Sequence, residues 1–291
     1  MRRVVKRSLC AALLLFSLVL SAGGDPYGGR GYLWNHYFET DPRLRELYGT
    51  RDIPRGDRER CEAARELLQC PGGAEPAVEA SGGGRACPGN VVAEIEGSVP
   101  GAIIVSAHLD RAGGGEGAVD DLSGVVMLGM LYTYYLDRPH RHTLVFVAFD
   151  GEEEGLTGSR RFIEESPHMP GEVVAVVNLE CLGVRFPRSW EEGSSESLEE
   201  ILIRAGKQYN IDSRPVSIGG VSADSVPFLT AGYPAITIQG IAPEDIALLG
   251  TDWDRHSVVR GDIFDVTFWV LLEFINELDA LTIVPDPANG R

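Results

Sequence analysis

Short apolar runs that alternate with helical segments limit the folds open to this chain more than any other feature. Most of the runs are continuously apolar, as in strands that are buried on both faces of a sheet. Strands are predicted at 90–98, 101–108, 143–149, 172–180, near 214–219 and at 235–239. Helices are predicted at 57–68, 123–137, 158–166, 197–209, 224–232 and 263–281. This order predicts an α/β fold: a single domain of three layers, in which helices cover both faces of a mixed, largely parallel, twisted sheet.

The first residues have the composition of a secretory signal peptide. A basic start precedes an apolar run from Leu9 to Leu20, and small residues follow the run. The run is short for a membrane span, and small residues are typical of a cleavage site. We therefore expect residues 1–24 to be removed from a secreted or periplasmic protein that has no stable membrane insertion. Residues 25–291 are expected to form its one domain, and an uncleaved anchor is the alternative.

The sequence is strongly acidic, with 43 Asp and Glu residues against 26 Lys and Arg residues and a formal net charge of −17. Such a surface repels nucleic acid and anionic membranes, so neither is an expected partner. Cations and cationic groups fit it better. A solvated surface accounts for most of the acidic residues, and only those at special positions need another explanation.

Four cysteines follow the predicted signal peptide: Cys61, Cys70, Cys87 and Cys181. Export permits disulfide bonds. Cys70 and Cys87 bracket a stretch rich in Gly and Pro and are the favoured pair. Cys61 and Cys70 share a helical segment and can pair only across its end, so the sequence leaves the connectivity open.

Side chains of the types that can ligate metal ions lie at the ends of several predicted strands and near two predicted helices. They are His108 and Asp110 after the strand 101–108, Asp120 and Asp121 before the helix 123–137, Glu152 and Glu153 after the strand 143–149, Glu180 at the end of the strand 172–180, and His256 near the last helix. Because sites in such folds gather beyond the carboxyl ends of the strands, we expect these residues to converge. Two imidazoles with carboxylates, and no required thiolate, suit a catalytic zinc site.

Charge balance favours two ions over one. Asp120, Glu153 and Glu180 supply three negative charges, and a bound hydroxide adds the fourth that balances two Zn²⁺ ions. An aspartate can bridge two ions about 3.5–4 Å apart. The adjacent Glu152 and Glu153 can divide the tasks of proton acceptor and ligand. Each residue alone also has a structural explanation, such as an N-cap or a solvated loop. Their joint placement at the ends of core segments favours the metal site.

Five motifs, in order along the chain, resemble those of the co-catalytic di-zinc exopeptidases. They are NVVAEIEGSVPGAIIVSAHLD, GAVDDLSG, FVAFDGEEEGLTGS, VVNLECLG and SVPFLTAGYPAITI. The family includes secreted leucyl-type aminopeptidases, glutamate carboxypeptidase II and the glutaminyl cyclases. The similarity runs from about residue 90 to residue 256, and five motifs in family order are much more specific than any one of them.

The resemblance implies a zinc-peptidase catalytic domain and a role for each candidate residue. The positions that match metal ligands are His108, Asp120, Glu153, Glu180 and His256, with Asp120 bridging, Glu153 and His256 completing one zinc, and His108 and Glu180 the other. The remaining matches are Glu152 as general acid/base, Asp110 as the acid that orients His108, Asp121 at a position of unusual peptide geometry, and Asp224 as an acid for substrate binding. Orientation of a ligating histidine by a carboxylate is common at metal sites.

The implied activity is that of a secreted zinc-dependent aminopeptidase, which hydrolyses amino-terminal residues from peptides and proteins. The alternative is a glutaminyl cyclase-like acyltransferase that forms amino-terminal pyroglutamate with one zinc, because the Asp150–Gly151 prefix resembles that branch. A non-catalytic ectodomain is disfavoured by the complete set of ligand positions. A carboxypeptidase needs a basic residue for the terminal carboxylate, and the sequence does not identify one.

The chain departs from the family pattern at three further points. Glu180 stands where aspartate is common, Ser225 stands where histidine is usual, and the segment after His256 lacks an early aspartate. The first two bear on metal geometry and substrate contacts. The third bears on the support of His256.

Overall fold

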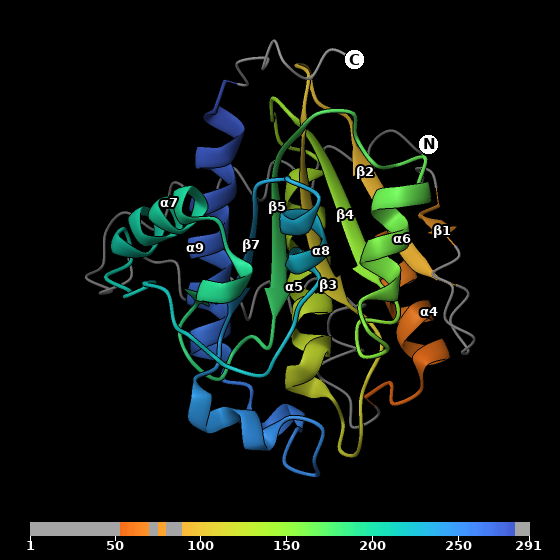
Figure 1. Cartoon of the computed structure of the whole chain (residues 1–291), viewed down its shortest axis with the longest axis vertical. Coiled ribbons are helices and arrows are strands. Elements are labelled where there is room, and N and C mark those ends of the chain that lie inside the picture. Colours follow the sequence, from red (N-terminus) through yellow and green to blue (C-terminus); the bar gives the residue numbers. More distant parts are fainter. Residues whose placement is uncertain (1–52, 70–74, 80–88, 283–291) are drawn as a thin grey trace, which may run out of the picture.

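A mixed sheet of seven strands runs through the part of the chain that the computed structural model describes, residues 53–69, 75–79 and 89–282 (Figure 1). The strands are β1 (Ala77–Glu79), β2 (Asn90–Ile95), β3 (Ala102–His108), β4 (Thr143–Phe149), β5 (Val173–Glu180), β6 (Arg188–Ser189) and β7 (Ala235–Gln239). Their order is β1-β2-β4-β3-β5-β7-β6. The central strands β4, β3, β5 and β7 are parallel, and every pairing that involves β1, β2 or β6 is antiparallel.

Helices cover both faces of this sheet. They are α4 (Asp57–Leu67), α5 (Ser123–Tyr135), α6 (Thr157–Glu165), α7 (Glu196–Lys207), α8 (Ser225–Thr230) and α9 (Gly261–Ala280). In Figure 1, α6 and α8 lie on the near side of the sheet and α5 lies on its far side. The helices α4, α5, α7 and α9 share one apolar core with the sheet, and α6 and α8 share another. The predicted three-layer α/β fold is confirmed.

The central strands are buried on both faces, and β3 shows why. Ile103 and Val105 pack into the core that contains α5 and α9, whereas Ile104 packs into the core that contains Phe162 of α6 and Phe228 of α8. All seven residues of β3 are buried. Burial of one large apolar side chain contributes about 1.5–3 kcal/mol to stability. The carboxyl end of β3 is therefore held by packing on both sides of the sheet.

The predicted elements are confirmed in position, with one exception. β4 and β7 have the predicted bounds, and the other matched elements differ at their ends by at most three residues. The strand predicted near 214–219 is wrong, because this segment forms only an isolated bridge between Val216 and Trp190. Pro215 cannot donate a ladder hydrogen bond, which limits pairing there. β1 and β6 were not predicted, since three and two residues are too short to give a pattern.

Several predictions fall on residues outside the described ranges. These are the signal peptide at 1–24 and the favoured Cys70–Cys87 pair. Cys61 of α4 is disulfide-bonded, and Cys181 is a free, buried thiol. Within residues 53–69, 75–79 and 89–282, no helix combines the length and the apolar character that crossing a membrane requires.

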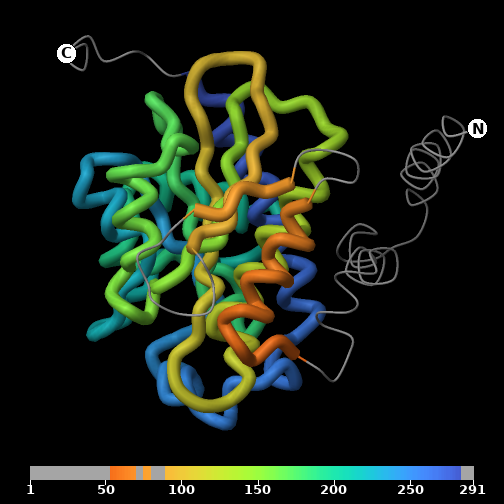
Figure 2. Tube along the Cα trace, turned by 90° about the vertical axis from the view of Figure 1, so that its right-hand side faces the viewer, coloured from red at the N-terminus to blue at the C-terminus, as the bar shows by residue number. Residues whose placement is uncertain are grey.

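The carboxyl ends of the parallel strands meet at the lower edge of the sheet in Figure 1. At this edge the loop 109–117, which leads from β3 toward α5, lies beside the segment 249–255, as the yellow and blue tubes at the bottom of Figure 2 show. The Gly114 N–H donates to the Gly250 carbonyl (2.9 Å), and the Glu116 N–H donates to the Asp254 carbonyl (2.8 Å). Gly115 has φ 77°, and a Cβ there would lie 2.0 Å from the Thr251 carbonyl oxygen. The close approach of the two segments therefore requires glycine at this position.

Candidate metal and catalytic site

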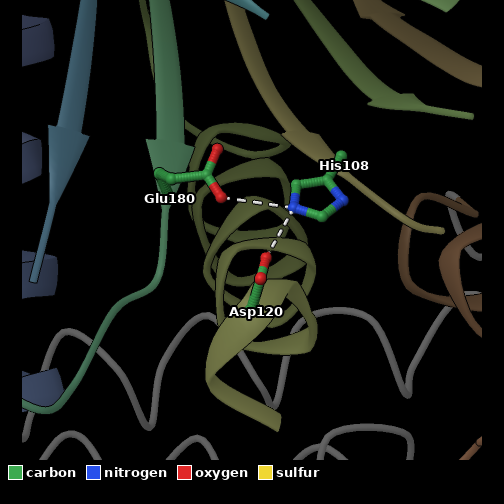
Figure 3. A group of neighbouring side chains, drawn as sticks. All are labelled: His108, Asp120 and Glu180. Carbon is green, nitrogen blue, oxygen red and sulfur yellow. Dashed lines mark hydrogen bonds and ion pairs between the residues drawn. The ribbon is translucent and has the colours of Figure 1, made fainter. Parts of the chain in front are cut away.

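The last residue of β3, His108, is the centre of a compact group of ligand-type side chains. Its Nε2 lies 2.9 Å from Asp120 Oδ1 and 3.2 Å from Glu180 Oε1 (Figure 3). One ligand atom from each of these three residues lies within 4.8 Å of the others. The histidine side chain is only 1% exposed, whereas the two carboxylates are partly exposed. The group therefore lies at the boundary between the buried core and the surface at this edge of the sheet.

Asp120 and Asp121 lie in an irregular turn, Ala118–Leu122, directly before α5. The peptide between them is cis, which confirms the unusual geometry that the resemblance implied. The two side chains make different contacts. Asp120 reaches His108, whereas the buried Asp121 accepts hydrogen bonds from the backbone N–H groups of His108 (3.3 Å), Gly124 (3.1 Å) and Cys181 (3.0 Å). Asp121 thus ties together the ends of β3 and β5 and the start of α5.

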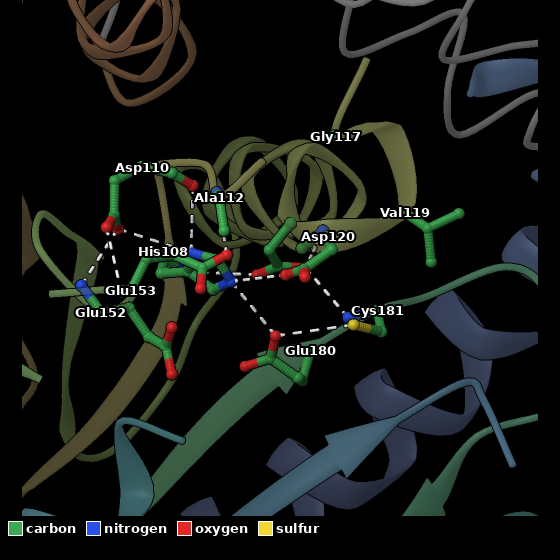
Figure 4. A network of polar contacts seen from close by, with 12 residues as sticks. His108, Asp110, Ala112, Gly117, Val119, Asp120, Glu152, Glu153, Glu180 and Cys181 are labelled. Carbon is green, nitrogen blue, oxygen red and sulfur yellow. Dashed lines mark hydrogen bonds and ion pairs between the residues drawn. The ribbon is translucent and has the colours of Figure 1, made fainter. Parts of the chain in front are cut away.

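Asp110 lies on the other side of the His108 ring (Figure 4). Nδ1 of His108 is 3.2 Å from the Asp110 carbonyl oxygen and 3.5 Å from Asp110 Oδ1. The Asp110 carboxylate also accepts hydrogen bonds from the backbone N–H groups of Glu152 (3.1 Å) and Glu153 (3.0 Å). One side chain therefore orients the histidine and anchors the turn that carries both glutamates. These contacts fit the orienting role that the resemblance implied for Asp110, which stays a prediction.

Glu152 and Glu153 follow β4 and form a second group with His108. Glu152 is partly buried, and Glu153 is exposed. The Glu153 Oε1 accepts a hydrogen bond from the Ala112 N–H at 3.0 Å, which ties this carboxylate to the loop after β3. Glu152 is thus the more enclosed of the two side chains, and the predicted split between proton acceptor and ligand stays a prediction.

Glu180, the last residue of β5, is held by its neighbours in the chain. Asn178 Nδ2 donates to Glu180 Oε2 at 3.3 Å, and the Cys181 thiol lies 3.6 Å from Glu180 Oε1. Oε1 is the oxygen that also faces His108. The longer side chain at this position, compared with the aspartate that is common in the family, therefore still reaches the histidine.

The surroundings of this cluster shift the pKa values of several of its groups upward. Burial raises the pKa of Glu152 to about 10, with the charge of Glu180 adding to the shift and that of His108 opposing it. Burial and the charge of Asp120 raise the pKa of Glu153. Burial disfavours the charged form of His108, but the charge of Glu180 and hydrogen bonds to Asp110 and Asp120 outweigh it and raise the pKa of this imidazole well above its ordinary value. A divalent cation can replace protons on these groups, because it neutralises the same carboxylates.

His256 belongs to neither group. It begins a short turn, His256–Val258, and is exposed. Its backbone N–H donates to Glu116 Oε2 at 2.9 Å, so the contact with the rest of the edge is made by the main chain. Four of the five residues predicted as ligands thus gather around or at His108, and His256 does not.

Asp224, predicted to bind substrate, precedes α8 and is only 1% exposed. Its carboxylate oxygens accept no hydrogen bond of good geometry within the described part of the chain. Burial raises the pKa of Asp224 to about 7, although the nearby Ser159 hydroxyl lowers it. Asp224 does not line the cavity described next, so its contact with substrate stays a prediction.

A cavity of about 470 Å³ opens beside the cluster. Asp120, Glu152, Glu153 and Glu180 line its acidic part. Trp190, Ile218, Ile241 and Leu249 are among the residues that line its apolar part. A volume of this order is typical of sites for small ligands. The cavity therefore places an apolar wall next to the candidate metal ligands.

Two further residues support the turn that carries Asp120. The buried Asp254 accepts hydrogen bonds from the Val119 N–H (2.7 Å) and the Asp120 N–H (3.4 Å), and burial raises its pKa to about 6. The guanidinium of Arg60, only 1% exposed, donates to the carbonyls of Glu116 and Gly117, both at 2.7 Å.

Sequence reasoning missed both roles. The motif TDWDRHS contains Asp254 and could have drawn attention to it. Arg60 stands in a segment whose pattern predicts a surface helix, and nothing in that pattern distinguishes it from exposed arginines.

The fold and the cluster together define a class: an α/β protein with a histidine–carboxylate site at the carboxyl edge of its parallel strands. Residues 90–259, more than half of the chain, match Peptidase family M28. The chain belongs to this family, which confirms the resemblance seen in its motifs.

The matches to relatives by sequence cover only parts of longer proteins. The chain is 36% identical over 121 residues to a vacuolar membrane protease of Eremothecium gossypii, a match that covers 41% of this chain and 12% of that protein. It is 29% identical over 152 residues to aminopeptidase YwaD of Bacillus subtilis, covering 50% of this chain and 33% of the relative. The match thus spans a third or less of the length of either relative.

Solved structures share the fold. The zinc aminopeptidase BSAP of Bacillus subtilis matches with a TM-score of 0.57 and 22% identity, over 65% of this chain and 49% of the other. The glutaminyl cyclase of Porphyromonas gingivalis matches with a TM-score of 0.63 and 18% identity, over 85% of this chain and 96% of the other. At such identities the likeness shows the fold alone.

Proposed function

We propose that this chain is an exported, zinc-dependent aminopeptidase that removes amino-terminal residues from peptides. One observation carries the proposal: in a member of peptidase family M28, His108, Asp120 and Glu180 converge at the sheet edge with Glu152 beside them and a cavity in front. Export rests on the pattern of residues 1–24, and the vacuolar membrane relative is the reason to test it.

The residues present fit a zinc ion. Tetrahedral zinc ligands at about 2.1 Å from the ion lie about 3.4 Å from each other. The Nε2 of His108 lies 2.9 and 3.2 Å from the facing oxygens of Asp120 and Glu180, so small adjustments suffice. Three protein ligands leave a fourth position for water or substrate, as in catalytic zinc sites.

We further propose a second ion, held by Asp120, Glu153 and His256. Asp120 has two oxygens, of which Oδ1 faces His108, and Glu153 carries a carboxylate into the same cavity. The exposed side chain of His256 supplies the remaining donor. When bound, zinc supplies a Lewis acid that polarises the scissile carbonyl and acidifies the attacking water.

Glu152 is the proposed general base and acid. It accepts a proton from the attacking water while the water oxygen bonds to the scissile carbonyl carbon, and it then donates that proton to the leaving amine as the C–N bond breaks. Its partly buried position suits this task, because a carboxyl group there exchanges a proton near neutral pH once cations offset the burial that otherwise raises its pKa. Asp110 accepts a hydrogen bond from the Glu152 N–H and so fixes the backbone position from which the Glu152 side chain extends.

The cavity supports peptide amino termini as substrate. Its apolar wall, which includes Trp190 and Ile218, suits a hydrophobic first side chain. Its carboxylates suit a free α-ammonium group. Protein amino termini that are extended enough to enter the cavity belong to the same substrate class.

A glutaminyl cyclase-like acyltransferase is the second candidate, and one observation favours it. Among the described residues, the compact group contains one histidine and the other predicted histidine ligand lies outside it, an arrangement that suits a site for one zinc. The Asp150–Gly151 prefix of the glutamates points the same way.

One assay separates the two candidates. The purified chain, with its zinc content measured, is given leucine p-nitroanilide and a glutaminyl peptide side by side. Release of free leucine with about two zinc ions per chain supports the aminopeptidase. Formation of pyroglutamate with one zinc per chain would replace it by the cyclase.

A further inference from the structure

We propose that Arg160 forms a carboxylate-binding subsite in the cavity, and that the preferred substrates are dipeptides and similarly short peptides with a free carboxyl terminus. The inference rests on the proposed aminopeptidase function and narrows its substrate class. Arg160 lies on α6, the helix that follows the turn with the two glutamates, and among the described residues that line the cavity it is the one basic residue.

The position of the Arg160 guanidinium is set by one hydrogen bond. Its Nε donates to the Gly155 carbonyl at 3.3 Å, and Gly155 also lines the cavity. Within the described part of the chain, its two terminal nitrogens have no hydrogen-bond acceptor. They present the paired N–H donors that match the two oxygens of a carboxylate.

The lack of a local acid is specific to this arginine. The next residue, Arg161, has its Nη2 2.6 Å from Glu165 on the same helix. Arg160 has no carboxylate within 4 Å among the described residues, although four carboxylates line the same cavity. In a chain of net charge −17, an arginine that faces an acidic cavity without an ion-pair partner is available for an anionic group of a ligand.

The distribution of charge in the cavity matches a zwitterion. Carboxylates including Glu152 and Glu180 line one part, the apolar wall with Trp190 lines another, and Arg160 adds a positive charge. A dipeptide carries an ammonium group, apolar side chains and a carboxylate within a few bonds of one another. All three can therefore be met at once in a cavity of about 470 Å³, whereas a long peptide has its carboxylate elsewhere.

The test compares substrates that differ only in the terminal charge. The zinc-loaded protein is assayed with Leu-Leu and with Leu-Leu amide, and the result is the ratio of their kcat/KM values. We expect a ratio of about ten in favour of Leu-Leu, which corresponds to about 1.4 kcal/mol. In Arg160→Gln the ratio falls to about one, in Arg160→Lys it is intermediate, and in the neighbouring control Arg161→Gln it stays at ten.

The ratio is insensitive to general losses of activity, because both substrates use the same enzyme sample. A measurement without mutation adds to it: the wild-type ratio falls as salt rises from about 0.05 to 0.5 M, since salt screens an exposed charge pair. A wild-type ratio of one, or a ratio of ten that persists in Arg160→Gln, overturns the subsite. Leucine p-nitroanilide has no carboxylate, so its hydrolysis reports on the proposed function separately. Failure to cleave any of the three substrates counts against the aminopeptidase itself.

Discussion

The two histidines predicted as metal ligands lie in contrasting parts of the molecule. His108 ends the central strand of the sheet, is buried, and touches three acidic side chains. His256 begins a short turn in the segment that follows β7, is exposed, and is held through its backbone by Glu116. The sequence places His108 at the end of a predicted strand and His256 near the last predicted helix, and the resemblance implied a ligand role for both.

The contrast shows what positions a ligand. At His108 the backbone is fixed by β4 and β5 on either side, so the side chain starts from a place that core packing determines. At His256 the backbone depends on contacts between two irregular segments, such as that of Glu116 with Asp254. The first arrangement is formed by folding alone. The second depends on loop contacts, and the proposed second ion would add a further constraint there.

The largest expected effect tests this contrast directly. His108→Ala is expected to abolish high-affinity zinc binding and to lower kcat/KM by about 10⁴-fold or more, because the site loses its central ligand and with it the Lewis acid. His256→Ala is expected to retain about one zinc per chain and to lose the second. Zinc content by atomic absorption measures both. Equal zinc content in His256→Ala and wild type would show that this residue is no ligand.

The next effect concerns Glu152. Glu152→Gln is expected to bind zinc as wild type does and to lower kcat by about 10²–10⁴-fold, because the amide cannot accept the proton of the attacking water. Steady-state kinetics on leucine p-nitroanilide, with zinc content checked, measures the loss. Glu154→Gln, a neighbour outside the predicted site, is the matched control. Normal turnover by a zinc-loaded Glu152→Gln protein would refute the role.

A smaller effect is expected at Asp254, which accepts hydrogen bonds from the backbone of the turn that carries Asp120. Asp254→Ala removes the acceptor of two backbone N–H groups in the turn, so zinc affinity is expected to fall by about 10–100-fold with the ligands intact. Competition with a chromogenic chelator measures the affinity. Asp252→Ala, an exposed acid of the same segment, is the control and should keep the wild-type affinity. An equal loss in both variants would point to general disturbance of the segment.

An effect of about tenfold is expected in the pH dependence of metal binding. Burial raises the pKa of Glu152 to about 10, and acidic neighbours raise that of His108, so both groups favour their protonated forms at neutral pH. Zinc must displace at least one proton, and its affinity should therefore rise about tenfold per pH unit near pH 7. Calorimetry in buffers of different ionisation enthalpy counts the protons released. Binding without proton release would contradict the protonated forms of these groups.

A substrate with a blocked amino terminus tests the proposed role of the cavity carboxylates. If the carboxylates of the cavity hold the α-ammonium group, acetyl-Leu-Leu amide is expected to be cleaved at least about tenfold more slowly than Leu-Leu amide. Product analysis by chromatography measures both rates. Equal rates would remove the basis for an aminopeptidase while leaving the metal site in place.

Much of the fold could be read from periodicity, because the strongest elements are those buried most completely. β4 and β7 have the predicted bounds, and all their residues except Thr143 are buried. The failures were weakly patterned segments. The bridge at Val216 and the two-residue strand β6 depend on what lies beside them, and no local pattern reports that.

The site was predicted to the same extent and for the same reason. His108, Asp120, Glu153 and Glu180 follow or precede core elements, and the structure brings them together. The supporting contacts of Arg60 and Asp254 were not predicted, because each acts on a backbone group that is distant in sequence. The place of Arg160 in the cavity was not predicted either, because its position on a polar helix is an ordinary one for an arginine.

The sequence by itself determined the α/β class, the order of the strands and helices along the chain, and the residue types that gather at one edge. It could do so because burial imposes a period on local sequence and because parallel strands all end on the same side. Only the tertiary structure decided which carboxylate faces His108, that His256 lies outside the compact group, and that one arginine shares the cavity with four acids. These are distances between residues far apart in the chain, and such distances are fixed by packing and loop contacts that no local pattern encodes.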